Sequence, residues 1–147
     1  MSIEDDVALL EHVPTLQLLG TTALRMLAIG SEQRMFRRGD VLFKVGEDAD
    51  AGFIVQRGSF RVQAGNGAET IAGPGALIGE LSLITEMVRP ATAIAIEHSA
   101  VIRIARSLFR RVLENDATAA RRLRDEFASR TSQIASDILM AGTKMNV

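Results

Sequence analysis

The distribution of glycine constrains the fold of this chain more than any other feature of its sequence. Nine of the twelve glycines lie between Gly39 and Gly79, and none lies between Leu81 and Met140. Because glycine favours turns and weakens helices, this contrast divides the 147 residues into a middle part of short strands and a helical end. A chain of this length makes one domain and buries about two-thirds of its unfolded surface.

Short segments rich in Val, Ile and Phe alternate with turn residues through the middle part. The predicted strands are Val41–Val45, Phe53–Gln56, Phe60–Gln63, Thr70–Ala72, Ala91–Ile96 and Ala100–Ile104. Between two of them, the pair Asn66 and Gly67 fits a tight hairpin that requires positive φ. This pattern is typical of a small antiparallel barrel, so we predict a mainly β fold with flanking helices.

The start of the chain is predicted to be helical and not to be an export signal. Thr21 or Thr22 can cap a short helix that stops at Gly30, because its apolar residues are spaced three and four apart. The first residues, Met-Ser-Ile-Glu-Asp-Asp, lack the positive charge of a signal peptide, and the longest apolar runs are too short to span a membrane. The chain has no cysteine, which suits a reducing compartment. We expect a cytoplasmic protein without membrane insertion.

Charge is balanced along the chain. Its 17 Lys and Arg residues and 18 Asp and Glu residues give a formal net charge of -1. No global positive field is available to recruit nucleic acid, so any bound anion has to be held locally. The arginines between Arg103 and Arg130 are interleaved with acidic residues, which is typical of a solvated helix face.

The segment between Gly79 and Arg89 carries the most distinctive chemistry. Gly79 permits a sharp bend, and the helix-prone residues 81–84 after it can begin a helix with unpaired amide groups. Such amides attract anions, and Arg89 can fold back over them to add a full charge and a planar fork of donors. Phosphate is the anion that this arrangement suits.

Glu80 lies at the edge of this predicted anion site. A carboxylate aimed at phosphate would repel it, whereas one at the edge can accept a hydrogen bond from a sugar hydroxyl. A phosphate together with a ribose hydroxyl indicates a nucleotide. The simpler interpretation, a surface ion pair between Glu80 and Arg89, does not account for the glycine and the helix start.

Two stretches of the sequence resemble the cyclic-nucleotide-binding domain family. Residues 78–83, Ile-Gly-Glu-Leu-Ser-Leu, with residues 89–92, Arg-Pro-Ala-Thr, are similar to the phosphate-binding cassette of that family. Residues 46–58 are similar to its first signature. The family includes the sensor domains of the bacterial cAMP receptor protein, protein kinase A regulatory subunits and cyclic-nucleotide-gated channels.

This resemblance implies a fold for nearly the whole chain. The family has an eight-stranded antiparallel β-roll, a jelly-roll-like double-stranded β-helix, with an N-terminal helix and two C-terminal helices. A single domain over 1–147 would hold N-terminal helices in 1–31, the roll in 32–106 and C-terminal helices in 107–141, with the phosphate-binding segment at 78–92. A DNA-binding member would begin its helix-turn-helix near the point where this sequence ends, so direct DNA binding is not expected.

The resemblance also implies roles for individual residues. Glu80 would bind the ribose 2′-hydroxyl and Arg89 the cyclic phosphate. The phosphate cradle would be completed by Gly79 and the amides of Leu81 and Ser82. Four further residues would lie near the ligand: Ile78, Pro90, Ala91 and Thr92. Two residues of the last helix would cover the base: Ile134 and Ile138.

Two positions depart from the family pattern. Gly52 stands where a bulky strand residue is usual, which predicts a local packing change. Pro90 stands where a small residue with an N–H is usual, so a backbone donor to phosphate is absent. Its loss would cost about 1.5 to 3 kcal/mol, or about one to two decades of affinity. Relatives that prefer cGMP often carry a hydroxyl residue at this position, so Pro90 favours cAMP.

The C-terminal helices are predicted from caps and apolar spacing. Ser107 can cap a helix over 108–115, and Asp116 can cap a longer one from 117 to about 141. Two apolar rows follow the longer helix: Phe127, Ile134 and Ala141 in one, and Thr131, Ile138 and Met145 in the other. These rows can pack on the chain's own roll, or form a homodimer seam as the corresponding helix does in the cAMP receptor protein.

Catalysis by this chain is not expected. The two histidines, His12 and His98, lie in unrelated segments without a metal-ligand pattern. No motif places a histidine base beside Ser82 or Thr92, and the six phenylalanines suit a core better than a ligand platform. We predict neither a metal nor a cofactor.

These features lead to one principal hypothesis and two alternatives. The principal hypothesis is a regulatory sensor that binds cAMP in preference to cGMP and signals to an unknown protein effector by moving its C-terminal helix. The first alternative is a dimeric interaction module of the same fold that binds nucleotide weakly or not at all. The second is a truncated transcription regulator of the cAMP-receptor type.

Overall fold

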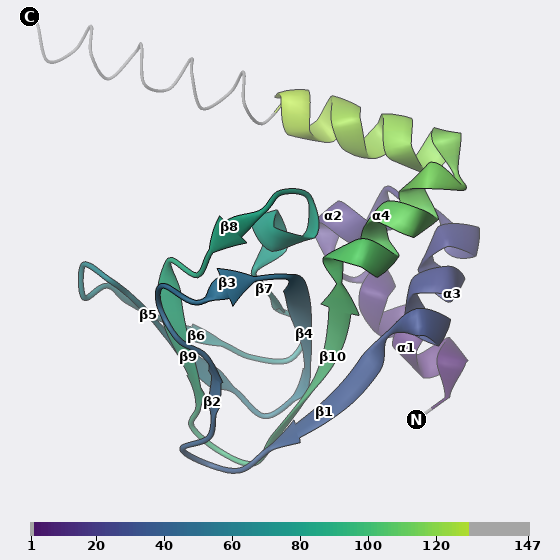
Figure 1. Cartoon of the computed structure of the whole chain (residues 1–147). Helices are drawn as coiled ribbons and strands as arrows, with labels where there is room; N and C mark the ends of the chain where they lie inside the picture. Colours follow the sequence, from purple (N-terminus) through teal and green to yellow (C-terminus); the bar gives the residue numbers. More distant parts are fainter. Residues whose placement is uncertain (1, 130–147) are drawn as a thin grey trace, which may run out of the picture.

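The computed structural model describes residues 2–129, which form a β-roll with helices packed against one side (Figure 1). The chain enters through three helices: α1 (Ile3–Glu11), α2 (Pro14–Gln17) and α3 (Thr21–Gly30). Ser2 and Asp5 cap α1 reciprocally, each side chain accepting from the other's backbone amide. Pro14 occupies the first turn of α2, where its missing N–H leaves no helix hydrogen bond unmade.

The predicted short helix before the roll is α3, and it ends at Gly30 as expected. Its N-cap is Gly20, with no side-chain hydrogen bond at the cap, so the predicted cap at Thr21 or Thr22 is wrong. Its apolar face, which includes Leu24 and Leu27, is buried.

Within residues 2–129, ten antiparallel strands form two four-stranded sheets and a short ladder. The first sheet has the order β1 (Glu32–Phe36), β10 (Ser99–Ala105), β4 (Ala51–Arg57) and β7 (Leu77–Ile78). The second has the order β2 (Val41–Phe43), β9 (Ala91–Ala95), β5 (Phe60–Ala64) and β6 (Glu69–Ala72). The ladder pairs β3 (Asp48–Ala49) with β8 (Met87–Val88). The two larger sheets supply the eight strands expected of the roll.

The six strands predicted from the sequence are all present, with ends shifted by at most two residues. The four that were not predicted are β1, β3, β7 and β8. β1 is polar and mostly exposed, and the other three have only two residues each, too few to show an alternating pattern.

The turn between β5 and β6 differs from the predicted one. Gly67 has a φ of 90°, as expected, but Asn66 does not have positive φ. The Gly67 amide donates to the Ala64 carbonyl at 2.9 Å, so Gly65 and Asn66 occupy the centre of the turn and Gly67 follows it. The loop is therefore one residue longer than a two-residue hairpin.

Two buried clusters hold the layers together. β4 and β10 are buried on both faces: Ile54 and Ile102 pack against the helices, and Val55 and Val101 point into the roll. Inside the roll, the inward face of β9 carries only alanines, Ala91, Ala93 and Ala95. These small side chains leave space within the roll near the start of β9.

The roll is followed by α4 (Arg106–Glu114) and by a helix that the structure describes over 117–129. Asp116 caps the second helix, accepting from the Ala119 amide at 3.0 Å, which confirms the predicted cap. The predicted cap at Ser107 is wrong, because α4 begins two residues earlier than predicted, with Ala105 as its N-cap. The predicted continuation to residue 141 lies outside the described residues.

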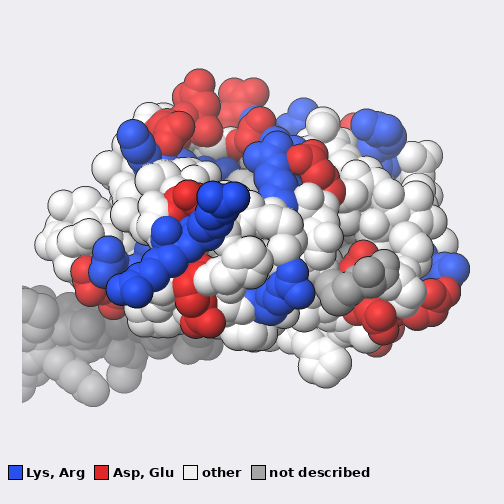
Figure 2. All heavy atoms as spheres, turned by 90° about the horizontal axis from the view of Figure 1, so that it is seen from below, with Lys and Arg blue, Asp and Glu red and all other residues white. Residues whose placement is uncertain are grey.

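Charged side chains do not gather by sign on the face shown in Figure 2, where basic and acidic groups are interspersed. This agrees with the nearly balanced charge of the sequence. Within residues 2–129, no helix combines the length and the apolar character needed to cross a membrane.

Candidate functional site

Gly79 makes the predicted sharp bend between β7 and η1 (Glu80–Leu83), a one-turn 3₁₀ helix. Its φ of 79° and ψ of 39° lie in the left-handed region. A Cβ atom at this position would lie 2.6 Å from Nη1 of Arg89 and 3.0 Å from Oγ of Ser82. Glycine is needed here both for the backbone conformation and for the space that the arginine occupies.

Ser82 is fully buried and holds the bend closed. Its hydroxyl donates to the Ala51 carbonyl at 2.8 Å and also contacts the Gly79 carbonyl. Its amide, expected to face a phosphate, donates instead to the Gly79 carbonyl at 3.1 Å, as the geometry of a 3₁₀ turn dictates. The backbone donor expected at Ser82 is therefore used within the turn.

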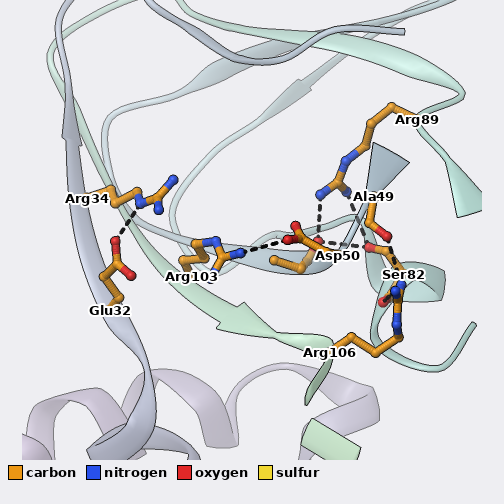
Figure 3. Close-up of polar contacts among 9 residues, drawn as sticks. Glu32, Arg34, Ala49, Asp50, Ser82, Arg89, Arg103 and Arg106 are labelled. Atoms are coloured by element: carbon orange, nitrogen blue, oxygen red, sulfur yellow. Dashed lines mark hydrogen bonds and ion pairs between the residues drawn. The ribbon is translucent and has the colours of Figure 1, made fainter. Parts of the chain in front are cut away.

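Arg89 lies at the centre of the site with only 3% of its surface exposed. As Figure 3 shows, the side chain points toward Ser82 and the β3–β4 link. Nη2 donates to the Ala51 carbonyl at 2.8 Å and Nη1 to the Ser82 hydroxyl at 3.3 Å. Nε is buried and has no hydrogen-bond partner among residues 2–129. Arg89 therefore reaches the bend at Gly79 as predicted, and its Nε–H group has no acceptor among the described residues.

Two aromatic rings flank the guanidinium of Arg89. The ring centroids of Phe43 and Phe53 lie 4.2 and 5.4 Å from its Cζ atom. Both phenylalanines are buried, as expected of core residues, but they also form the wall behind the cation. Their position fixes the plane of the guanidinium relative to the bend.

Burial lowers the pKa of the Arg89 guanidinium from its ordinary value, because desolvation disfavours the charged form. The carboxylates of Asp50 and Glu47 raise this pKa in part, and the nearby charges of Arg103 and Arg106 lower it further. No carboxylate forms an ion pair with Arg89 within the part of the chain that the structure describes. An incoming anion would offset the desolvation of this cation.

The two sequence stretches that carry the family resemblance meet at this point. The Arg89 amide donates to the Glu47 carbonyl at 2.7 Å, and the Gly46 amide donates to the Arg89 carbonyl at 2.8 Å. Together with the bond from Arg89 to Ala51, these contacts hold Arg89 and its neighbours against residues 46–58. The first signature therefore forms one wall of the site.

Glu80 is the first residue of η1, and its carboxylate is tied to the N-terminal helices. Oε1 accepts a hydrogen bond from the Thr15 hydroxyl at 2.8 Å, although the two residues are 65 positions apart. Arg89 is buried against Ala51 rather than held at the surface. The alternative of a surface ion pair across an exposed loop does not describe this segment.

A cavity of about 200 Å³ opens between β7, η1 and the start of β9. Eight of the predicted site residues line it: Ile78, Gly79, Glu80, Leu81, Ser82, Arg89, Pro90 and Ala91. Phe43, Val62 and Met87 complete a largely apolar wall. The cavity therefore combines one buried cation and one carboxylate with apolar surface, a composition typical of small-molecule sites.

Among the described residues, Thr92 is the predicted site residue that does not line the cavity. Thr92 faces away from the cavity, since its hydroxyl accepts from the Val45 amide at 3.0 Å and ties β9 to the end of β2. Pro90 lines the cavity and offers only its carbonyl, which accepts from Gly65 at 3.3 Å. The two predicted lid residues, Ile134 and Ile138, lie outside the described residues.

The hydrogen bonds of the Arg106 side chain were not predicted from the sequence, because the arginines after Arg103 were interpreted as a solvated helix face. Its Nη1 donates to the carbonyls of Ala49, Ser82 and Thr85 at 2.7, 3.3 and 3.1 Å. It lies at the N-terminus of α4, where a cation opposes the helix dipole. The sequence carried no signal for these contacts, because it placed the start of this helix after Ser107.

Gly52, where a bulky residue was expected from the family pattern, packs closely against η1. A Cβ at this position would lie 3.1 to 3.3 Å from the side-chain carbons of Leu83, which is buried in the core under the helices. The glycine therefore makes room for the last residue of η1.

The comparisons with known proteins agree with this geometry. A family model described as "Cyclic nucleotide-binding domain" matches residues 33–116. The chain belongs to this family. The resemblance predicted from the two sequence stretches is confirmed, as is the predicted roll.

Individual relatives support the same assignment. The Cyclic AMP receptor protein of Thermus thermophilus is 36% identical over 107 residues, covering 64% of this chain and 50% of that protein. A cyclic nucleotide-binding-like protein from Brucella abortus is 36% identical, with a TM-score of 0.66 over 75% of this chain and 98% of that one. The N-terminal domain of a transcriptional regulator from Streptomyces coelicolor shares the fold, with a TM-score of 0.80 at 24% identity over 88% and 94% of the two chains. The chain spans half or less of the length of the curated relatives it matches.

Proposed function

We propose that this chain is a regulatory sensor that binds a cyclic nucleotide, with the cyclic phosphate at Arg89 and the ribose 2′-hydroxyl at Glu80. The observation that carries the proposal is the buried guanidinium of Arg89, whose Nε lacks a partner among residues 2–129 beside an apolar cavity. A desolvated cation with an unused donor favours an anionic partner. Family membership supports a cyclic nucleotide as that anion.

Each residue around the cavity has a role in this proposal. Gly79 and the Leu81 amide approach the phosphate beside Arg89, and Ser82 orients the arginine through its hydroxyl. The apolar residues Ile78 and Ala91 support the remainder of the ligand. Thr92 contributes indirectly, by fixing the start of β9.

The proposed ligand is cAMP in preference to cGMP. Pro90 lines the cavity directly after the phosphate arginine and carries neither a hydroxyl nor an amide hydrogen. A guanine base therefore lacks a hydroxyl partner at this position, whereas adenine does not need one. The missing amide also predicts a weaker phosphate contact than in members with a donor there.

The proposed output is a movement of the C-terminal helix that follows ligand binding. Leu83 of η1 and Phe109 of α4 belong to the same buried cluster, so a shift of the phosphate-binding segment is transmitted to the helices. The movement would be sensed by an unknown cytoplasmic protein effector or by a homodimer interface. Ile134 and Ile138 would cover the base. The chain itself would not be catalytic.

Isothermal titration calorimetry with cAMP, cGMP and 5′-AMP tests the proposal. We expect cAMP to bind more tightly than cGMP, and 5′-AMP to bind more weakly than both. Arg89→Ala should lower the affinity at least about a hundredfold, because it removes two charge-assisted bonds of about 1.5 kcal/mol or more each. Arg110→Ala, at an exposed arginine on α4, is the matched control and should bind as the wild type does. Equal heats for Arg89→Ala and the wild type would refute the site.

A second candidate function is an interaction module of the same fold that binds nucleotide weakly or not at all. Pro90 and the engagement of both Arg89 Nη atoms by Ala51 and Ser82 favour it. Absence of heat at millimolar cAMP would support this candidate. The third, a transcription regulator of which this sequence is a part, is tested by reading the gene beyond Val147.

A further inference from the structure

The hydrogen bond between Thr15 and Glu80 joins the N-terminal helices to the carboxylate assigned to ribose. Thr15 Oγ1 donates to Glu80 Oε1 at 2.8 Å, an ordinary distance for a hydrogen bond between oxygens. Thr15 is 3% exposed, whereas Glu80 lines the cavity. One end of this bond is therefore in the core and the other is at the binding site.

The donor is mounted on a rigid part of the fold. Thr15 lies in α2, between Pro14, which fixes the backbone at the start of that helix, and Leu16, which is fully buried. Val13 and Leu19, on either side of α2, belong to the same buried cluster as the first sheet. The backbone that carries the Thr15 hydroxyl is therefore held by that core.

Glu80 itself sits on a less rigid element. It begins a one-turn 3₁₀ helix directly after the left-handed Gly79, and such short helices have weak internal hydrogen bonding. A glutamate side chain has three rotatable bonds, and ordering it opposes binding unless another group has already ordered it. Thr15 supplies that order by holding one carboxylate oxygen.

We propose that Thr15 is a positioning residue that determines ribose specificity, by orienting the Glu80 carboxylate toward a 2′-hydroxyl. This inference rests on the proposed function, because it requires Glu80 to accept from a ribose. The ligands selected are nucleotides with a free 2′-hydroxyl, and those rejected are 2′-deoxy and 2′-substituted nucleotides.

The test compares affinities for cAMP and 2′-deoxy-cAMP by calorimetry in wild type and Thr15→Val. Valine has nearly the shape of threonine but no hydroxyl, so it removes the hydrogen bond and keeps the packing. We expect cAMP affinity to fall about tenfold, the consequence of losing one hydrogen bond to a charged group, with little change for 2′-deoxy-cAMP. The preference for the ribose form should therefore fall about tenfold.

Three further variants separate positioning from general structure. Thr15→Ser keeps a hydroxyl and should restore most of the preference. Glu80→Gln should lower the preference, and adding Thr15→Val to it should lower the preference no further, because Thr15 acts through Glu80. Thr22→Val, at an exposed threonine of α3, should leave both affinities unchanged. Thr15→Ala, which also lacks the hydroxyl, takes the place of Thr15→Val if circular dichroism shows that the valine variant does not fold.

Each outcome decides between the two proposals. An unchanged or larger ribose preference in Thr15→Val, with cAMP still bound, overturns the role of Thr15 and leaves the proposed function standing. Equal losses of affinity for both nucleotides also overturn it, since they indicate a structural role only. Failure of the wild type to bind cAMP at all overturns the proposed function and this inference together.

Discussion

Arg89 and Arg106 direct their guanidinium groups at the same stretch of backbone, from opposite sides of the β3–β4 link (Figure 3). Arg106 places one nitrogen among three carbonyl oxygens and joins α4 to β3 and to the segment after η1. Arg89 is more deeply buried, yet among residues 2–129 its side chain donates hydrogen bonds only to Ala51 and Ser82, and Nε has no acceptor there.

This difference is the one expected between a structural cation, Arg106, and a cation proposed to bind ligand, Arg89. A guanidinium that joins elements donates its hydrogen bonds to carbonyl oxygens, and its removal leaves those acceptors without a donor. A guanidinium reserved for an anion remains incompletely paired, and its burial destabilises the free protein until the ligand arrives. The two arginines should therefore respond in opposite ways to the same substitution.

Arg89→Met gives the largest expected effect. Cyclic-nucleotide affinity should fall at least about a hundredfold, while the free energy of unfolding stays the same or rises. The Ala51 carbonyl keeps the hydrogen bond that the Ser82 hydroxyl donates. The substitution also removes the buried charge of Arg89, whose desolvation lowers the pKa of that group. Urea denaturation and calorimetry measure the two quantities. A loss of stability greater than about 1 kcal/mol would contradict the comparison, because it exceeds the usual effect of a change that breaks no needed contact.

Arg106→Met should act mainly on stability. The carbonyls of Ala49, Ser82 and Thr85 lose a charged donor, which should lower the free energy of unfolding by about 1.5 to 3 kcal/mol. Nucleotide affinity should fall less than in Arg89→Met. Arg110→Met on the same helix is the control, and equal urea midpoints for the two variants would show that the three contacts contribute nothing.

Gly79→Ala tests whether the bend at Gly79 is needed to position the Arg89 side chain. Alanine in the left-handed region costs about 1 to 2 kcal/mol, and its Cβ would approach Nη1 of Arg89. We expect that loss in urea denaturation, together with weaker nucleotide binding. Gly75→Ala provides the control, because it has a similar φ of 88° but open space around its Cβ. Equal losses of nucleotide affinity in both variants would exclude a specific effect on Arg89.

Asp50→Asn gives the smallest expected effect. Asp50 pairs with Arg103 at 3.2 Å, but 71% of its side chain is exposed. Exposed pairs contribute about 0 to 1 kcal/mol, so thermal unfolding should shift little. A stability loss as large as that of Arg106→Met would mean that this pair, rather than the carbonyl contacts, holds the region together.

Local sequence predicted those parts of the site that are close along the chain. The bend at Gly79, the carboxylate after it and the arginine ten residues on required only glycine conformation and short-range geometry. Two of the three predicted N-caps are wrong. Thr21, Thr22 and Ser107 all suit a cap by residue type, but neither helix has its N-cap at these residues. The choice among adjacent positions depends on tertiary packing.

Contacts between distant segments could not be predicted in the same way. Thr15 reaches Glu80 across 65 residues, and no local pattern marks a threonine in a four-residue helix as a partner for a carboxylate. The rings of Phe43 and Phe53 were expected in the core, and only the folded roll shows that Arg89 lies against them. The amide of Ser82 was misjudged because the one-turn helix closes more tightly than an α-helix.

Leu83 packs closely against Gly52, which lies 31 residues earlier in the chain. The side-chain size allowed at one of these positions therefore depends on the side chain at the other. A larger residue at 52 would push η1 outward and carry Glu80 with it, so the size of residue 52 sets the position of the Glu80 carboxylate. Homologues with a bulky residue there should have a smaller side chain at position 83. Transferring the nucleotide specificity of one such domain to another would then require exchanging the residues at positions 52 and 83 together.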